Sequence, residues 1–288
     1  MAAKLKWPGL RTYEGEHLQR IALPLGGIGT GTVSLGGRGN LCDWEVMNRP
    51  AKGYVPGPRF SGAPFLCLRA QAAGKPPVTR LLEGPVPAHE IQGSMGSVAA
   101  NHGWPRFREA HFDTAYPLGQ VHLRDPEVPL QARIEAFNPF VPADTEASSL
   151  PLAVLRCVLR NPGKKTVKAS VCLSVPNFVG HDGAEGECVC NRNRNRRRKM
   201  QGLQGILLDS TVSSQPRRSG AVWHWRRRQP ECRHALHGSR PAGGLRSSTS
   251  GMISKGMIGS MTVLPMGKPC PSRPSPPRRV YLQGPSGP

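Results

Sequence analysis

Two carboxyl groups that stand close together in the sequence, those of Asp43 and Glu45, could take part in proton transfer. Residues at i and i+2 of a β-strand point to one face, so a strand here would place the two carboxylates side by side. A pair in which one carboxyl group is the acid and the other the nucleophile needs the two groups roughly 5 Å apart with different pKa values. Solvated acids, or acids paired with Arg38, explain the same pattern, and we favour that interpretation.

A second run with this spacing contains Glu109, His111 and Asp113. Imidazole and carboxylate groups bind metal ions and exchange protons. The polar face of a half-buried strand explains the alternation with fewer assumptions. We therefore predict no catalytic residue, no metal site and no cofactor, and we assign no substrate-binding residue.

The glycine-rich stretch of residues 23–50 imitates a phosphate-binding loop at Gly27, Gly29 and Gly31. Such a loop must open directly into a helix, whose free N–H groups hold the anion. Residues 32–35 are instead Thr-Val-Ser-Leu, which favours a strand. We expect a short strand between two turns.

Aromatic and cysteine side chains suggest two further kinds of site. Trp44 and Trp104 could stack on sugar rings, although tryptophan in a sandwich more often fills the core or a domain interface. A zinc set can be drawn in the C-terminal part, but its spacing matches no familiar zinc motif. Its members are Cys188, Cys190, Cys232, His234 and His237.

Short strands are the elements that we expect to position these groups. In residues 152–175, two alternating apolar runs flank the turn sequence Asn-Pro-Gly-Lys-Lys, which predicts a β-hairpin. Residues 64–70, 119–124 and 128–136 predict further strands. Without helical periodicity between them, the fold class is all-β, an antiparallel β-sandwich.

Charge divides the chain into two parts. The net charge is +21, of which residues 1–190 contribute +4 and residues 191–288 contribute +17. We predict a β-sandwich domain in residues 1–211 and a disordered tail rich in Arg, Pro, Gly and Ser in residues 212–288. The scarcity of acidic residues and the loss of pattern near residues 191–212 also fit a change of reading frame.

The location follows from what the sequence lacks. No run of about 18 apolar residues is present, which predicts no transmembrane segment. Residues 1–15 show no secretory signal, which predicts a cytoplasmic protein with reduced cysteines.

Several motifs occur in a characteristic order. They are residues 25–31, 36–39, 43–45, 48–50, 116–117, 137–142 with Asp144, and 148–151, followed more loosely by 175–178 and 202–208. Together they resemble the N-terminal domain of glycoside hydrolase family 116, which includes the non-lysosomal glucosylceramidases, also called bile acid β-glucosidases. The resemblance covers about residues 20–211.

The resemblance implies an N-terminal β-sandwich followed, in the family, by a large (α/α)₆ barrel. That barrel holds the nucleophilic glutamate and the aspartate acid/base of a retaining β-glucosidase. We therefore expect a chain truncated before the barrel and inactive alone, with the barrel as its packing partner and a β-glucoside or glycolipid as the parent enzyme's substrate.

Two non-catalytic alternatives stay open. The chain could be a carbohydrate-binding sandwich, or an adaptor whose basic tail holds nucleic acid without sequence specificity.

Overall fold

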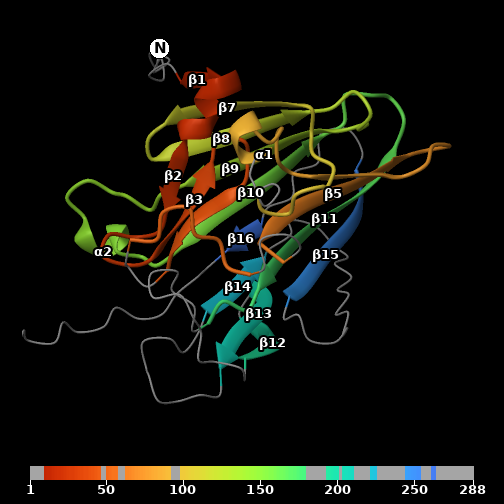
Figure 1. Cartoon of the computed structure of the whole chain (residues 1–288). Helices are drawn as coiled ribbons and strands as arrows, with labels where there is room; N and C mark the ends of the chain where they lie inside the picture. Colours follow the sequence, from red (N-terminus) through yellow and green to blue (C-terminus); the bar gives the residue numbers. More distant parts are fainter. Residues whose placement is uncertain are drawn as a thin grey trace, which may run out of the picture.

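The computed structural model describes residues 10–46, 50–57, 62–91, 98–179, 193–200, 203–210, 221–225, 244–253 and 261–263. Its largest sheet has six strands, in the order β1-β7-β8-β9-β10-β16 (Figure 1). These are β1 (Arg11–Glu14), β7 (Glu109–Ala115), β8 (Leu118–Arg124), β9 (Gln131–Phe137), β10 (Ala153–Arg160) and β16 (Met261–Val263).

Three smaller sheets complete the described part. The four-stranded sheet has the order β15-β11-β5-β6, and two three-stranded sheets have the orders β2-β3-β4 and β12-β13-β14. Their bounds are β2 (Ala22–Leu25), β3 (Thr32–Gly36), β4 (Leu41–Glu45), β5 (Phe65–Ala72), β6 (Val78–Leu81), β11 (Val167–Pro176), β12 (Asn193–Met200), β13 (Leu203–Ser210), β14 (Ala221–Trp225) and β15 (Gly244–Ile253).

Helices are few and short in the part of the chain that the structure describes. They are the 3₁₀ helix η1 (Gly15–Arg20) and the single-turn helices α1 (Ala88–Ile91) and α2 (Thr145–Ser148). Among the described residues, none of these helices has the length and apolar character needed to cross a bilayer.

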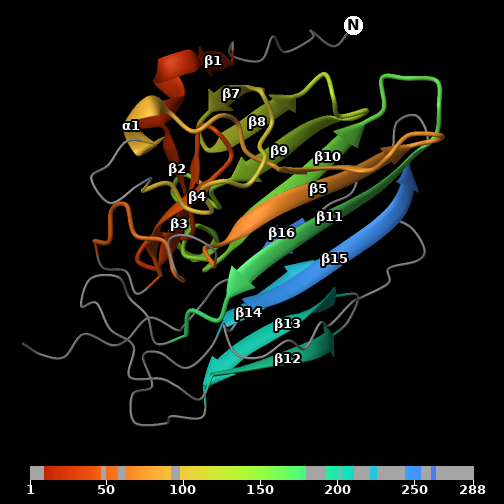
Figure 2. The same cartoon turned by 45° about the vertical axis from the view of Figure 1, so that its right-hand side comes forward.

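The two larger sheets pack their apolar faces together. Figure 2 shows the layer of β5, β11 and β15 beside the layer of β8, β9 and β10. Their inward residues form one core cluster with those of the β2-β3-β4 sheet, and its members include Leu25, Trp44, Leu68, Phe112, Val121, Ile134, Leu155 and Val167. Every strand pair within the four sheets is antiparallel. The predicted all-β, antiparallel fold class is confirmed.

The predicted hairpin in residues 152–175 is wrong in its pairing, although both strands and the turn exist. β10 pairs with β9 and β16, whereas β11 pairs with β5 and β15. The turn between them passes from one sheet to the other, and Asn161 closes it by donating to the Lys165 carbonyl at 2.8 Å. Both strands turn apolar faces to the same core from opposite sides, and alternation alone does not distinguish this arrangement from a hairpin.

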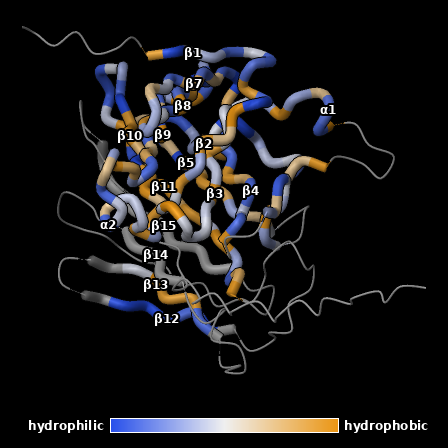
Figure 3. Tube along the Cα trace, turned by 90° about the vertical axis from the view of Figure 1, so that its left-hand side faces the viewer, coloured by the Kyte–Doolittle hydropathy of each residue, from blue (hydrophilic) through white to orange (hydrophobic). Residues whose placement is uncertain are grey.

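The arginine-rich run after residue 191 forms a strand in its described part. Residues 194–198 of β12 are exposed, and Figure 3 shows the hydrophilic character of this strand beside β13. Buried Asp209 on β13 forms ion pairs with Arg194 and Arg196. Asn177, just after β11, donates to the carbonyl oxygens of Arg194 and Asp209 at 3.1 and 3.3 Å. These contacts join the β12–β13 pair to the end of β11.

Three strands, β14, β15 and β16, lie within the predicted tail of residues 212–288. The rest of that tail lies outside the described residues, and its predicted disorder stays a prediction. The cysteine and histidine set at residues 188–237 also lies outside them.

Candidate functional site

The glycine-rich stretch turns the chain between β2 and β3. A strand, β3, follows it at Thr32, as the sequence predicts. The turn therefore does not lead into a helix whose N-terminus could bind an anion. A Cβ on Gly27 would lie only 2.5 Å from the backbone carbonyl carbon of Ser149. Glycine at this position therefore lets the turn lie directly against the backbone after α2.

Asn138, just after β9, connects two neighbouring turns. Its buried side chain donates through Nδ2 to the carbonyl oxygens of Pro24 at 2.9 Å and Gly26 at 3.1 Å. Its backbone N–H donates to the carbonyl of Pro117 at 2.9 Å, in the turn between β7 and β8. One residue thus holds the β2–β3 turn and the β7–β8 turn together.

Helix α2 joins the same group of turns (Figure 1). The carboxylate of Asp144 caps the helix by accepting from the Ala147 N–H at 2.8 Å. The carbonyl of Ser148 accepts from the Ile28 N–H at 2.8 Å, and its hydroxyl accepts from the Val141 N–H at 2.9 Å. These bonds fix α2 against the glycine-rich turn.

We call these four connected segments, residues 24–31, 116–118, 137–142 and 144–151, the loop cluster. It exposes several large apolar side chains, with Ile28 60% and Tyr116 59% exposed. The exposed members are Ile28, Tyr116, Leu118, Phe137, Val141 and Leu150. Several large apolar side chains exposed on connected segments favour an interaction site.

Asp43 and Glu45 accept hydrogen bonds from the backbone of the loop at residues 51–53. The backbone is bulged at Asp43, whose φ is 47°, and its Oδ1 accepts from the Gly53 N–H at 2.7 Å. Glu45 Oε1 accepts from the Ala51 N–H at 3.0 Å. The cation beside both is Lys52, at 3.6 and 3.4 Å. Burial lowers the pKa of Lys52, but the two carboxylates raise it more, so the net shift is upward.

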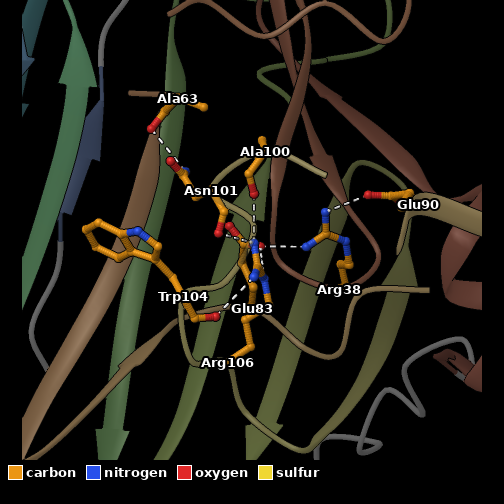
Figure 4. Close-up of polar contacts among 8 residues, drawn as sticks. All are labelled: Arg38, Ala63, Glu83, Glu90, Ala100, Asn101, Trp104 and Arg106. Atoms are coloured by element: carbon orange, nitrogen blue, oxygen red, sulfur yellow. Dashed lines mark hydrogen bonds and ion pairs between the residues drawn. The ribbon is translucent and has the colours of Figure 1, made fainter. Parts of the chain in front are cut away.

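The suggested pairing of these acids with Arg38 is therefore wrong, because Arg38 has other partners (Figure 4). Its guanidinium is buried, with Nη1 2.5 Å from Glu83 Oε2 and Nη2 3.2 Å from Glu90 Oε2. Glu83 Oε2 also accepts from Arg106 Nε at 3.0 Å. One buried carboxylate thus pairs with two guanidinium groups from different loops, and Glu90 supplies a second negative charge beside Arg38.

Arg106 extends this network into the loop before β7 (Figure 4). It donates to the carbonyl oxygens of Ala100, Trp104 and Asn101 at 2.8, 3.1 and 3.3 Å. Asn101 is fully buried in the left-handed region and donates to the Ala63 carbonyl at 3.1 Å. The network fastens this loop to the segments at Arg38 and Ala63.

The two tryptophans considered as sugar platforms, Trp44 and Trp104, pack against aromatic neighbours. Trp44 is 0% exposed and meets Phe178 edge-on, with ring centroids 5.3 Å apart. Trp104 packs against Phe65 with centroids 4.9 Å apart. Trp44 is therefore a core residue and not a platform for a sugar ring.

A cavity of about 830 Å³ lies at the end of β7 and β8 that is remote from the loop cluster. Its walls come from η1, the β3–β4 turn, the segment around α1 and the polar face of β7 and β8, and they include Leu18, Arg38, Cys42, Glu90, Glu109 and His122. The described lining residues include no Trp, Tyr or Phe. The cavity therefore suits a small polar ligand better than a stacked sugar.

Burial beside the cavity strongly shifts the pKa of one thiol, that of Cys42. It raises the pKa of Cys42 to about 12, and the neighbouring carboxylate of Asp43 contributes to the rise. A thiol with this pKa stays protonated at neutral pH and is a poor nucleophile.

A polar cluster beside the cavity differs from the one that the sequence suggested. Glu109 faces Arg124 across the β7–β8 pair, whereas His111 faces His122. The group that comes together is His111, Asp113 and His122, with candidate ligand atoms all within 4.8 Å of one another. The alternation in β8 indicates that His122 lies on the polar face, but only the strand register places it opposite His111.

The two imidazole rings of this cluster are stacked, with centroids 4.4 Å apart and planes inclined by 9°. Asp113 Oδ2 lies 3.2 Å from His122 Nε2 and 3.9 Å from His111 Nε2. Burial lowers the pKa of His122, and His111 lowers it further, whereas Asp113 raises it. The net downward shift favours a neutral imidazole at His122.

The fold and these sites define a β-sandwich domain with an apolar loop cluster at one end and a polar cavity at the other. Residues 22–242 match the family model described as beta-glucosidase 2, glycosyl-hydrolase family 116 N-terminal. The chain belongs to glycosyl-hydrolase family 116, and the matched region is the family's N-terminal domain. The resemblance drawn from the motifs is confirmed.

The match begins at β2 and runs past residue 211, where the sequence prediction placed the domain boundary. The boundary itself and the change of reading frame stay predictions.

Proposed function

We propose that this chain is the N-terminal sandwich domain of a retaining β-glucosidase of the glucosylceramidase type, and that its loop cluster packs against the catalytic domain of that enzyme. The family match supports the relation to a glycosidase. In this proposal the sandwich supplies no catalytic acid or nucleophile, and the β-glucoside or glycolipid is bound by the catalytic domain.

The observation that carries the proposal is the convergence of four of the family's motifs, at residues 25–31, 116–117, 137–142 and 148–151, on the loop cluster. The glycine-rich turn, the Tyr116–Pro117 turn and the segment from Phe137 to Val141 lie far apart in sequence. Hydrogen bonds donated by Asn138 and hydrogen bonds accepted by Ser148 join them. The joined segments expose several large apolar side chains. Covering several large apolar side chains with a partner removes them from water and lowers the free energy. The family's catalytic domain is the partner that we expect to cover them.

The carboxylates at β4 support the expectation that the chain alone is inactive. A retaining mechanism needs one ionised carboxylate aimed at the sugar and one protonated carboxyl beside the leaving group. Asp43 and Glu45 instead accept hydrogen bonds from the backbone of residues 51 and 53. Both carboxylates are thus engaged by the loop that follows β4.

The test is binding between this chain and a separately produced family 116 catalytic domain, measured by calorimetry. We expect a complex that the double variant Ile28→Ser, Tyr116→Ser weakens at least tenfold. The matched control is Ile91→Ser, which removes an apolar side chain that is 48% exposed on α1, outside the loop cluster. This control should bind like the parent chain.

Two results would overturn the proposal. The first is no complex at all, or equal weakening by the loop-cluster variant and the control. The second is turnover of an aryl β-glucoside by this chain alone, which would place catalytic groups within it.

A further inference from the structure

We propose that His111, Asp113 and His122 bind a divalent transition-metal ion of the zinc class on the polar face of β7 and β8. This site lies outside the loop cluster and goes beyond the proposed packing function.

The backbone places all three side chains on one face. His111 and Asp113 are two positions apart on β7, and His122 stands directly opposite His111 on β8. Side chains with these relations point the same way and are close neighbours across the strand pair. The site therefore depends on sheet register and not on a flexible loop.

The donor set and its spacing fit zinc. A tetrahedral zinc ion with bonds of about 2 Å holds its ligand atoms about 3.3 Å apart. Asp113 Oδ2 and His122 Nε2 are already 3.2 Å apart, and His111 Nε2 lies 3.9 Å from the same oxygen. Binding would require the two imidazole rings, which are stacked and nearly parallel, to turn about their side-chain bonds until both Nε2 lone pairs and Asp113 Oδ2 point at one position.

Thr12 orients the carboxylate from a third strand. Its hydroxyl on β1 donates to Asp113 Oδ1 at 2.7 Å, which leaves Oδ2 directed at the imidazoles. Outer hydrogen bonds of this kind fix metal ligands, and their loss typically lowers metal affinity 10–100-fold. Glu14 lies opposite His111 on the same strand as Thr12 and adds negative charge.

Two arginines near His122 would oppose a cation, and acidic residues offset them. Arg133 lies opposite His122 on β9 and forms an ion pair with Glu135. Arg124 faces Glu109 across β7 and β8. The acidic residues that oppose these arginines are Glu135, which also pairs with Arg156, and Glu109 and Glu14.

Three protein ligands leave a coordination position for another group. His111 and His122 both line the cavity of about 830 Å³, so this position would face the cavity. A site of this kind holds water or a small anionic ligand as its fourth ligand.

The test is a titration of the full chain with Zn²⁺, followed by the ring-nitrogen signals of its nine histidines in long-range ¹H–¹⁵N spectra. We expect the signals of His111 and His122 to shift at the lowest Zn²⁺ concentrations. Asp113→Asn should weaken this binding at least tenfold, and Thr12→Val about 10–100-fold while leaving all three ligands in place. The control Glu109→Gln, on the same face of β7, should bind like the parent chain.

The proposal is overturned if Zn²⁺ shifts only histidines elsewhere in the chain, such as His234 and His237. It is also overturned if Asp113→Asn and Thr12→Val both bind Zn²⁺ as tightly as the parent chain. Backbone amide spectra of each variant verify that β7 and β8 remain paired, and Thr12→Val serves if Asp113→Asn disturbs them.

Discussion

The two ends of the β7–β8 hairpin carry opposite chemistry. At the Tyr116–Pro117 turn, the loop cluster exposes apolar side chains, and neutral hydrogen bonds from Asn138 to backbone carbonyls hold it together. At the other end, the cavity is lined by charged groups and supported by the buried Arg38–Glu83–Arg106 network. One rigid hairpin therefore supports a surface suited to covering by protein and a hollow suited to polar ligands.

The largest effect is expected from breaking the support of the cavity end. Glu83→Gln removes the carboxylate shared by Arg38 and Arg106; Arg38 keeps its ion pair with Glu90, whereas the buried guanidinium of Arg106 loses its ion pair. We expect a loss of about 3–5 kcal/mol in the free energy of unfolding. Urea denaturation measures it.

The matched control is Glu127→Gln, because Glu127 also accepts from two arginines but its side chain is 51% exposed. It should change stability by less than about 1 kcal/mol. Similar losses from both variants would show that burial of the network contributes nothing.

A smaller effect is expected at the loop cluster. Gly27→Ala would drive a Cβ into the backbone of Ser149 and Leu150, and we expect a loss of about 1–3 kcal/mol. Gly29 has a φ of +72° and open space around its Cβ position. Gly29→Asn should cost less, because asparagine tolerates this conformation. Equal losses in urea denaturation would contradict a steric role for Gly27.

The last prediction needs no substitution and no change in stability, and it concerns the reactivity of Cys42 at the cavity. Because burial raises the pKa of Cys42 to about 12, its thiol should react with iodoacetamide at pH 8 on the order of 10³-fold more slowly than an ordinary thiol. Reaction should accelerate as the pH rises toward that pKa. Peptide mapping by mass spectrometry measures the rate, with the urea-unfolded chain as the control. Equal rates in the folded and unfolded chains would show that folding does not raise the pKa of the Cys42 thiol.

Strands and their buried faces were predictable because side-chain alternation records burial directly. The alternation in residues 128–136 and 152–175 corresponds to β9, β10 and β11. Their pairing was not predictable, because a turn such as that at Asn161 can join neighbours in one sheet or cross to another. The cross-sheet connection satisfies the same apolar pattern as a hairpin.

The sites were less predictable than the strands. Arg38 lies near Asp43 and Glu45 in sequence, but its partners Glu83 and Glu90 arrive from a later segment. His122 joins His111 only through the register of two strands. In both cases, side-chain types were readable but their spatial neighbours depended on tertiary structure.

The position of β5 in its sheet has a consequence during synthesis. β6 follows β5 directly in the chain, whereas β11, its partner on the other side, comes roughly a hundred residues later. As the chain leaves the ribosome, one edge of β5 must wait for residues 167–176 to emerge before it can pair. In that interval the edge is open to strands of other nascent chains. The yield of folded protein should therefore depend on translation speed and chaperone supply as well as on the stability of the finished sandwich.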